Sequence, residues 1–269
     1  MAEKNHKITV VTVCYNAVNE IEDTILSVIN QTYPDKEYIV IDGGSTDGTV
    51  DIIRKYADRI DYWVSERDGG IYEGMTKGIE HATGDYINFM NAGDLFFDDH
   101  VLEEVFAGRH YDEDVIYGSN LNHYKGGYKS FHPHSMDVLP KAMPFCHQST
   151  FTKTAILREH HFNKEFRRVA DYVFFRDLYE RGGSFRRVPR YISVYDEYGV
   201  SSQMNMDTYF EMCRAFRWKP SLKDFFRILT EVRFRKIRYI RVKFMIDSWR
   251  KPYKYSLNRS HFKQMTEKF

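Results

Sequence analysis

Polar and acidic side chains stand where three apolar, β-branched runs of this sequence end. Asp42 closes one run, Asp94 follows another, and Tyr15 follows the first. Carboxylate oxygens are hard ligands that suit Mg²⁺ or Mn²⁺ on a diphosphate, and they also accept hydrogen bonds from a base or a ribose. These positions therefore predict a nucleotide or phosphate site. For Asp42 and Asp94 the alternative is a turn-forming role, because Asp is common where strands end.

Two titratable residues of the second half are further candidates for the site. Asp171 stands at the start of a predicted helix, Asp171–Arg181, where the helix dipole favours an ionised carboxylate by ~0.3–1 kcal/mol. Such a carboxylate can accept a proton from a hydroxyl, or it can simply be the N-cap of the helix. His147 lies in the stretch 145–151, which we expect to be extended. It could flank a ligand or be a structural, hydrogen-bonded histidine.

Apolar runs that alternate with amphipathic stretches form the framework for these residues. The periodicity predicts the following elements: strands at Ile8–Cys14, Tyr38–Asp42, Asp61–Ser65 and Tyr86–Met90, and helices at 19–31, 49–57 and 70–82. This order is typical of an α/β fold with a mostly parallel, Rossmann-like sheet flanked by helices. Ligands of such sheets bind outside the carboxyl ends of the strands. Residues far apart in the sequence are therefore expected to meet at one rim.

The middle of the chain is less regular. We expect a strand at Val115–Ser119, a hairpin over 120–133 that turns at Gly126-Gly127, and a last strand at Tyr191–Asp196. Two phosphate-binding patterns are missing: Cys14-Tyr15-Asn16-Ala17 stands where a dinucleotide fold has GxGxxG, and there is no P-loop. A diphosphate must then be held in another way, and a metal at Asp94 is the candidate.

Length and composition describe an ordinary globular chain. Of 269 residues, 42% are hydrophobic and 29% are charged, which argues against disorder. No apolar run approaches the ~20 residues of a membrane-spanning helix. The three cysteines, an odd number without a CxxC pair, predict neither a disulfide framework nor a zinc site. The N-terminus lacks the pattern of a secretory signal, so a cytoplasmic protein is expected.

The net charge of +1 conceals two regions of opposite charge. Residues 1–213 hold 22 Lys and Arg against 34 Asp and Glu, whereas residues 214–269 hold 17 against 4. We therefore expect a main domain at 1–213 and a basic tail at 214–269. Within the tail, apolar residues recur between the Lys and Arg of 222–249, which predicts an amphipathic helical extension with a cationic face.

Three kinds of partner fit such a tail. The combination of a basic and an aliphatic face favours an anionic membrane surface, bound through residues 214–259, where each basic residue contributes ~1 kcal/mol. This predicts a peripheral location on the inner face of the cell membrane. The first alternative is packing on the core or on a second copy of the chain in a homo-oligomer. Nucleic acid is the second alternative, but it is not expected, because no RNA-binding motif accompanies the charges.

The sequence resembles family 2 glycosyltransferases in five motifs, taken in order along the chain. They are ITVVTVCYN, IDGGSTDGT, SERDGGIYEGMTKGIEHATGDYINFMNAGD, Cys146-His147-Gln148-Ser149 and Ala170-Asp171-Tyr172. The forms IDGGSTDGT and GIYxxMxKGI are similar to a bacterial branch that builds O-antigen, capsule and exopolysaccharide. The resemblance covers residues 7–205 and implies the GT-A fold.

The resemblance implies a role for each matching position. Asp171 corresponds to the catalytic base, and Asp94 to the last carboxylate of a DxD-type motif that reaches a divalent metal, Mn²⁺ or Mg²⁺. Asp42 would hold the base or the ribose, and Tyr72 would stack on the base or fill the core. The positions that correspond to donor-binding residues are Val13, Tyr15, Asp42, Gly43, Asp68, Tyr72, Lys77, Asn91, Gly93 and His147.

The implied activity is an inverting transfer of a hexosyl or N-acetylhexosaminyl group from a nucleotide-diphosphate sugar, with a UDP-sugar expected. The implied acceptor is a glycan, lipid-linked, in bacterial surface polysaccharide synthesis. Two positions depart from the family pattern: Gly43 stands where a second acidic residue is usual, and the metal motif is reduced to Asn91-Ala92-Gly93-Asp94. A non-catalytic scaffold of the same fold is therefore one alternative. A sugar nucleotidyltransferase is another, but the Gly-rich triphosphate loop that it needs is missing.

Overall fold

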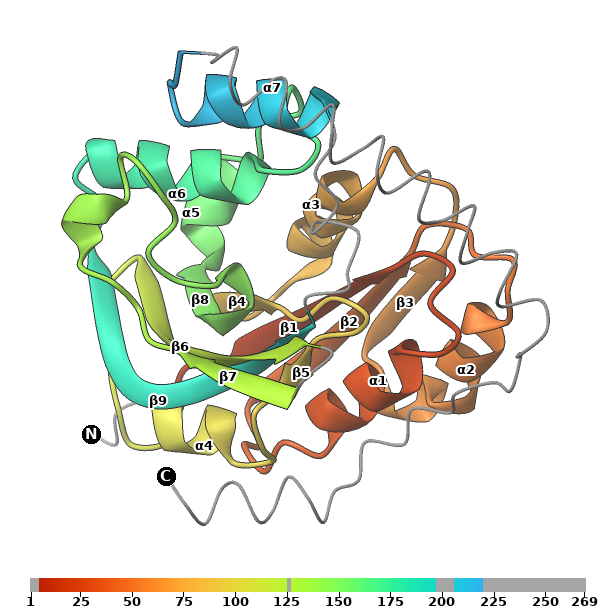
Figure 1. The fold of residues 1–269 in the computed structure, drawn as a ribbon. Coiled ribbons are helices and arrows are strands. Elements are labelled where there is room, and N and C mark those ends of the chain that lie inside the picture. Colours follow the sequence, from red (N-terminus) through yellow and green to blue (C-terminus); the bar gives the residue numbers. More distant parts are fainter. Residues whose placement is uncertain (1–4, 125–126, 197–205, 220–269) are drawn as a thin grey trace. The chain divides into compact units, whose positions relative to one another are not determined.

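A mixed β-sheet forms the centre of the protein (Figure 1). The computed structural model describes residues 5–124, 127–196 and 206–219. Within these ranges the sheet has nine strands: eight pair in the order β3-β2-β1-β4-β8-β6-β9-β5, and β7 pairs with β6. Helices cover both faces of the sheet, so the predicted α/β architecture is confirmed.

The first four strands are parallel, as the alternating pattern predicts. They are β1 (Ile8–Cys14), β2 (Lys36–Asp42), β3 (Tyr62–Ser65) and β4 (Tyr86–Phe89). All residues of β1 are buried, because a parallel sheet with helices on both faces has no solvated side. The register places Cys14 opposite Asp42, so β1 and β2 end side by side.

The later strands add antiparallel pairing to the sheet. They are β5 (Leu95–Phe96), β6 (Val115–Tyr124), β7 (Gly127–Phe131), β8 (Thr150–Lys153) and β9 (Phe185–Asp196). β6 and β7 form the expected hairpin, although Gly126 of its predicted turn lies outside the described residues. β9 starts well before the predicted strand at Tyr191 and pairs parallel to β6. The sequence pattern does not reveal the first half of this strand, because that half is basic and partly exposed.

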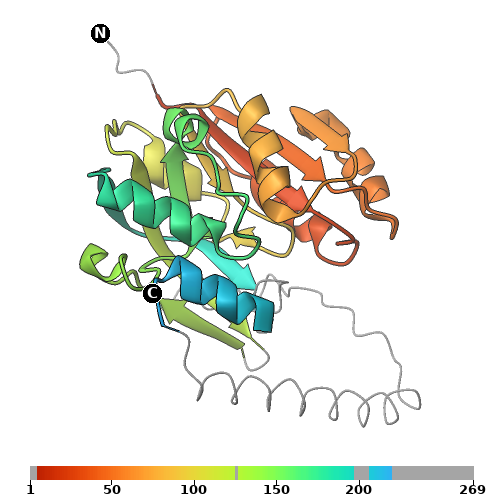
Figure 2. The same cartoon turned by 90° about the horizontal axis from the view of Figure 1, so that it is seen from above.

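The described residues form seven α-helices and three short 3-10 helices. The α-helices are α1 (Ile21–Ile29), α2 (Thr49–Lys55), α3 (Ile71–His81), α4 (Val101–Phe106), α5 (Thr154–Glu159), α6 (Ala170–Glu180) and α7 (Met206–Ala215). The 3-10 helices are η1 (Ala57–Arg59), η2 (Met136–Val138) and η3 (His147–Ser149). Helices α1, α2 and α4 lie on one side of the sheet, and α3, α5 and α6 lie on the other (Figures 1 and 2). The extended form predicted for 145–151 is wrong at its centre, where η3 precedes β8.

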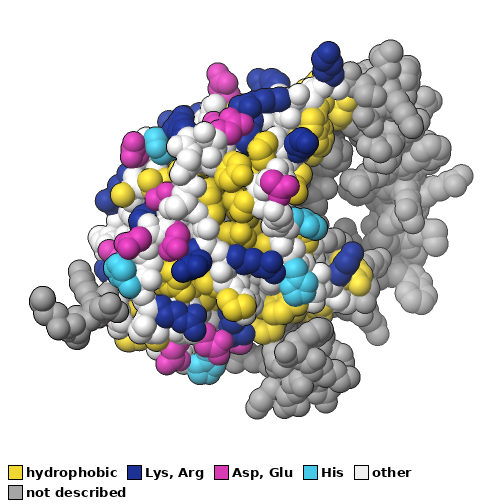
Figure 3. Space-filling model, turned by 90° about the vertical axis from the view of Figure 1, so that its left-hand side faces the viewer, with side chains coloured by type: hydrophobic (Ala, Val, Ile, Leu, Met, Phe, Trp, Pro, Cys, Tyr) yellow, Lys and Arg dark blue, Asp and Glu magenta, His cyan; other side chains and the backbone are white. Residues whose placement is uncertain are grey.

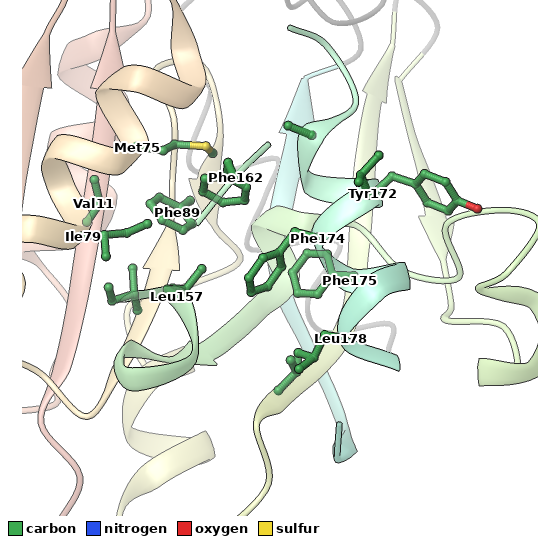
Figure 4. Close-up of a cluster of buried hydrophobic side chains, with 14 of the residues drawn as sticks. Val11, Met75, Ile79, Phe89, Leu157, Phe162, Tyr172, Phe174, Phe175 and Leu178 are labelled. Carbon is green, nitrogen blue, oxygen red and sulfur yellow. The ribbon is translucent and has the colours of Figure 1, made fainter. Parts of the chain in front are cut away.

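The core between the sheet and helices α3, α5 and α6 is rich in aromatic side chains (Figure 4). The ring centroids of Phe162 and Phe174 are 5.5 Å apart, and those of Phe174 and Phe175 are 5.2 Å apart. Val11 and Phe89 reach the same cluster from β1 and β4. Aromatic pairs contribute ~0.5–1.5 kcal/mol beyond their burial. Much of the aromatic content therefore stabilises this core.

One face carries hydrophobic side chains among interspersed basic and acidic ones (Figure 3), as is typical of a solvated surface. In the part of the chain that the structure describes, no helix combines the length and the apolar character needed to cross a membrane. The predicted amphipathic tail lies outside the described residues from position 220 onward, and α7 runs across the predicted boundary at residue 213.

Two glycines allow α3 to lie close against β1. A Cβ atom at Gly74 would come within 2.6 Å of the Val13 side chain, and one at Gly78 would collide with Val11. Glycine therefore sets the distance between the helix and the strand. Because α3 also carries Tyr72, this distance affects the rim of the sheet.

Gly78→Ala is expected to destabilise the protein. Overpacking costs about 1–3 kcal/mol, which exceeds the gain of about 1 kcal/mol from replacing a helical glycine. Urea unfolding of this variant and of Glu80→Ala, an exposed change on the same helix, measures the difference. Adding Val11→Ala should recover part of the loss, whereas wild-type stability of Gly78→Ala would contradict the close packing.

Candidate active site

The carboxyl ends of β1, β2 and β4 meet at one rim of the sheet. Backbone hydrogen bonds join the loops that follow them: Gly43 N donates to Cys14 O at 2.9 Å, and Ala92 N donates to Val13 O at 3.1 Å. The three loops therefore begin side by side, as the strand pattern predicts.

One short turn contacts the two candidate carboxylates of the rim. In η3, His147 Nδ1 lies 3.1 Å from Asp171 Oδ2, and Gln148 Nε2 donates to Asp94 Oδ2 at 2.9 Å. Asp94 follows β4, whereas Asp171 belongs to α6. Neighbouring residues of a single turn thus bring together two carboxylates that are far apart in the sequence.

Buried hydrogen bonds hold this turn in place. Asn88 of β4 is 0% exposed, and its Nδ2 donates to Gln148 O at 2.9 Å and to Thr150 O at 2.8 Å. On the other side, Ser149 Oγ lies 2.6 Å from Ser193 Oγ of β9. Because buried polar groups are costly to leave unpaired, these contacts fix η3 to two strands.

Asp171 is held at both carboxylate oxygens. Tyr72 OH donates to Oδ1 at 2.7 Å, while His147 occupies Oδ2. Asp171 is the second residue of α6, whose N-cap is Val169, so the N-cap role that the sequence left open is wrong. Burial acts to raise the pKa of Asp171, but the hydrogen bond and charge of His147 and the Tyr72 hydroxyl outweigh it and lower the pKa.

His147 lies between Asp171 and Asn91. Its Nε2 is 3.4 Å from Asn91 Nδ2, so the two ring nitrogens face different partners. Burial acts to lower the pKa of His147, but the hydrogen bond and charge of Asp171 outweigh it and raise the pKa. The neutral imidazole can donate from Nδ1 to Asp171 and accept from Asn91 Nδ2 at Nε2, and its raised pKa favours an ion pair with Asp171 as the pH falls.

Asp94 is a more deeply buried carboxylate. It is 6% exposed, and its Oδ1 accepts a hydrogen bond from Asp196 N at 3.3 Å. Burial raises the pKa of Asp94 to about 6, against the opposing effects of Gln148 and His147. Its nearest partner is thus a neutral amide.

The donor set suits a hard divalent cation. Asn91 is 7% exposed, and its Oδ1 finds no hydrogen-bond partner among the described residues. This unpaired amide oxygen and the carboxylate of Asp94 are the ligand type that Mg²⁺ and Mn²⁺ prefer. No group of three or more acidic, His or Cys side chains gathers as a metal cage within the described ranges. The remaining ligands would have to come from a diphosphate or from water.

Asp42 accepts hydrogen bonds from the loop that follows β2. It is 0% exposed and accepts hydrogen bonds from Gly44 N, Ser45 N, Ser45 Oγ, Ser65 Oγ and Cys14 Sγ. Burial acts to raise the pKa of Asp42, but the bonds from Ser45 and Ser65 outweigh it and lower the pKa. A carboxylate has about four acceptor positions, so these bonds occupy them. These contacts fit the turn-forming alternative for Asp42, and the direct contact with a base or a ribose stays a prediction.

Asp68 lies beside the position where the family pattern has its second acidic residue. A Cβ atom at Gly43 would lie 3.1 Å from both carboxylate oxygens of Asp68, and one at Gly74 would lie 3.3 Å from Oδ2. Gly70 N donates to Asp68 Oδ1 at 3.0 Å. The absence of side chains at Gly43 and Gly74 therefore makes room for this carboxylate at the rim.

Two tyrosines of the predicted donor site have different surroundings. Tyr15 is 66% exposed, although Val13 two residues before it is buried, and the left-handed backbone of Asn16 (φ 49°) turns the chain directly after Tyr15. Tyr72 instead packs its ring 5.4 Å from that of Phe162. Together with the bond to Asp171, this packing fits the core alternative for Tyr72, whereas the Tyr15 ring is open to solvent.

Two further predicted donor-binding residues are Lys77 of α3 and Gly93, which directly precedes Asp94. Lys77 Nζ pairs with Glu66 Oε1 at 2.8 Å, and the hydrogen bond to Glu66 raises the pKa of Lys77. Gly93 has φ +100°, which allows the turn that leads into Asp94, and its N donates to Thr24 Oγ1 at 3.0 Å. Lys77 is thus engaged by a neighbouring loop, while Gly93 shapes the rim.

Sequence reasoning missed two contacts of this site. It gave no role to Gln148 and did not foresee that the Tyr72 hydroxyl binds Asp171. A signal for Gln148 exists, because an amide in FCHQSTF, a stretch bounded by two phenylalanines, must be paired when it is buried.

Known glycosyltransferases resemble this chain in sequence and in fold. The family model described as glycosyl transferase family 2 matches residues 9–183. The PGL/p-HBAD biosynthesis glycosyltransferase of Mycobacterium bovis (strain BCG / Pasteur 1173P2) is 29% identical over 198 residues, which cover 68% of this chain and 74% of that protein. The putative teichuronic acid biosynthesis glycosyltransferase TuaG of Bacillus subtilis (strain 168) is 36% identical over 101 residues, or 36% of this chain and 40% of TuaG.

Two solved structures have a similar fold. S. aureus TarS 1-349 in complex with UDP-GlcNAc matches with a TM-score of 0.64 and 19% identity, covering 78% of this chain and 65% of that chain. The mannosyltransferase PcManGT from Pyrobaculum calidifontis, in complex with GDP-Man and Mn²⁺, matches with a TM-score of 0.54 and 21% identity, covering 71% and 57%. This chain therefore spans less than two thirds of either protein, and the likeness confirms the predicted GT-A fold.

His147→Gln is expected to lower stability in a pH-dependent way. An Asp with a lowered pKa stabilises the fold above its unfolded pKa of about 3.9 and loses this contribution as the pH falls. A His with a raised pKa stabilises below its unfolded pKa of about 6.5 and loses this contribution as the pH rises through its folded value. The loss in His147→Gln should therefore be largest between about pH 4 and 6.5, at about 1–3 kcal/mol.

Urea unfolding of the wild type and of His147→Gln across this pH range measures the difference. The change His161→Gln, at an exposed histidine, is the matched control and should have a small effect at every pH. A loss in His147→Gln that is the same at all pH values would show that His147 and Asp171 do not form an ion pair.

Proposed function

The chain belongs to glycosyl transferase family 2, and from this premise we propose that it transfers a sugar from a nucleotide-diphosphate sugar to a glycan hydroxyl, with inversion. The observation that carries the proposal is η3, because its adjacent residues contact Asp171 and Asp94. A single displacement needs a base on the side of the attacking hydroxyl and charge stabilisation on the side of the leaving group. His147 holds the carboxylate of Asp171, and the adjacent Gln148 holds that of Asp94. This arrangement suits one carboxylate as the base and the other on the side of the leaving group.

Asp171 is the proposed catalytic base. Each of its oxygens accepts one hydrogen bond, from Tyr72 or from His147, so the carboxylate is fixed in orientation and keeps further acceptor positions. Its side chain is 17% exposed. The lowered pKa keeps it ionised and ready to accept the proton of the acceptor hydroxyl, and transfer is then expected late, when that proton is already acidic.

Asp94 and Asn91 are the proposed ligands of a divalent ion, Mn²⁺ or Mg²⁺. When bound, such an ion neutralises the charge that develops on the diphosphate leaving group. Gln148 orients the Asp94 carboxylate, and the unpaired Oδ1 of Asn91 supplies a second oxygen. The Mn²⁺ in the solved PcManGT complex supports this choice of cation.

The proposed donor is a UDP-sugar, carrying a hexosyl or N-acetylhexosaminyl group. TarS, which has a similar fold, was solved with UDP-GlcNAc. At the rim, Tyr15 is exposed for stacking, and Asp68 is proposed to supply the acceptor that the change to Gly43 removes. The remaining donor contacts are proposed at Val13, Gly43, Lys77, Gly93 and His147.

The proposed acceptor is a lipid-linked glycan in bacterial surface polysaccharide synthesis. The names of the relatives, one for PGL biosynthesis and one for teichuronic acid biosynthesis, support this class. The basic residues of 214–269 are proposed to bind the anionic inner face of the cell membrane, where such acceptors are displayed. Residues 1–213 would then be the catalytic domain.

Asp171→Asn is expected to lower kcat by about 10²-fold or more, with donor affinity within about twofold of wild type. The amide keeps the shape of the carboxylate but cannot accept the proton. Release of the nucleoside diphosphate measures kcat, with UDP-, GDP- and dTDP-sugars tested in turn, Mn²⁺ present, and lipid-linked oligosaccharide as the acceptor. A thermal shift with the same nucleotides measures binding.

Asp177→Asn, on the same helix, is the matched control and should keep wild-type kcat. Unchanged turnover in Asp171→Asn would remove Asp171 from the role of base. Binding of nucleotide sugars without turnover by the wild type would favour the non-catalytic scaffold, which the reduced metal motif suggests as the alternative.

A further inference from the structure

We infer that Glu211, on α7, is a positioning residue for Asp171. The inference rests on the proposed function, because it concerns the base of that reaction. α7 lies beyond residue 183, where the match to the family model ends. The contact therefore belongs to a part of this chain for which the family match makes no statement.

The first turn of α6 has no cap of its own. Its N-cap is Val169, which makes no side-chain cap hydrogen bond. The first backbone N–H groups of a helix find no partner within the helix, and a Glu at the third helical position often accepts one of them. Here that position is Tyr172, which has no carboxylate. Asp171 stands in this turn, so the order of the turn decides where its carboxylate lies.

Glu211 supplies the missing acceptor from a neighbouring helix. Its Oε1 accepts hydrogen bonds from Arg168 N at 2.6 Å and from Val169 N at 3.1 Å. Glu211 is 8% exposed, and its negative charge stands at the positive end of the α6 dipole. Two backbone groups directly before Ala170 and Asp171 are thus fixed by one buried carboxylate.

Other contacts hold α7 against α6 farther from Asp171. Arg176 Nη1 donates to Ala215 O, and Arg217 pairs with Glu180 at 2.7 Å. These contacts engage the middle and the C-terminal end of α6, whereas Glu211 acts at its first turn. The two helices can therefore be loosened at either end by different substitutions.

Small displacements matter at this turn. The carboxylate of Asp171 meets Tyr72 of α3 and His147 of η3 at 2.7 and 3.1 Å, so it must stay within hydrogen-bond distance of two other elements. A misplacement of about 1 Å can cost about 10²-fold in rate. Glu211 limits such a displacement because it anchors the residues that lead into α6.

The test compares Glu211→Ala with Glu211→Gln, which keeps an oxygen acceptor at the same place. With UDP-sugar turnover as the readout, kcat of Glu211→Ala is expected to fall about tenfold or more with an unchanged KM for the donor. Glu211→Gln is expected to keep most of the wild-type kcat. Amide hydrogen exchange over residues 168–173 should be faster in Glu211→Ala than in Glu211→Gln. If Glu211→Ala does not fold, Glu211→Asp, with a shorter reach, replaces it with the same expectation.

Arg217→Ala is the matched control, because it loosens α7 at the other end of α6 and should keep kcat. Wild-type kcat in the folded Glu211 variant, or an equal loss in Arg217→Ala, would overturn the inference. Asp171→Asn is measured in the same series. If Asp171→Asn stays active, the proposed base itself is wrong; if it is inactive while Glu211→Ala matches the wild type, only the role of Glu211 is wrong.

Discussion

The site depends on the two side-chain contacts of η3, one from His147 to Asp171 and one from Gln148 to Asp94. Because the two residues are adjacent, the backbone of one turn sets the spacing between the carboxylates. Buried hydrogen bonds from Asn88 and between Ser149 and Ser193 fix that turn to strands on either side. Any change that moves the turn would therefore move both carboxylates together, and the site behaves as one unit.

The same turn gives the two carboxylates different ionisation. Asp171 faces an imidazole that can carry a positive charge, which lowers its pKa despite burial. Asp94 faces a neutral amide, so burial dominates and its pKa rises to about 6. Environments that separate the pKa values of two nearby carboxylates commonly separate their roles. This difference is consistent with Asp171 as an ionised base. It is also consistent with Asp94 as a carboxylate that gains its charge in the presence of a cation.

Much of the first half could be predicted from the sequence. Strand β1 has the predicted bounds, and the alternating pattern correctly placed the ends of β1, β2 and β4 at one rim. The pattern failed where contacts between distant elements decide the outcome. The hydrogen bonds that occupy the Asp42 carboxylate come partly from Ser65 of another strand. The acceptor at the start of α6 comes from Glu211 of another helix. Local spacing carries no information about such partners.

The central claim is that one rim holds a metal-bound diphosphate at Asp94 while the reacting sugar faces Asp171. A crystal structure of the protein with a UDP-sugar and Mn²⁺, with the anomalous signal of manganese recorded, tests it most directly. We predict a manganese peak within coordination distance of Asp94 and the anomeric carbon between that ion and the Asp171 carboxylate. A manganese peak away from Asp94, or a sugar that points away from Asp171, would contradict the account.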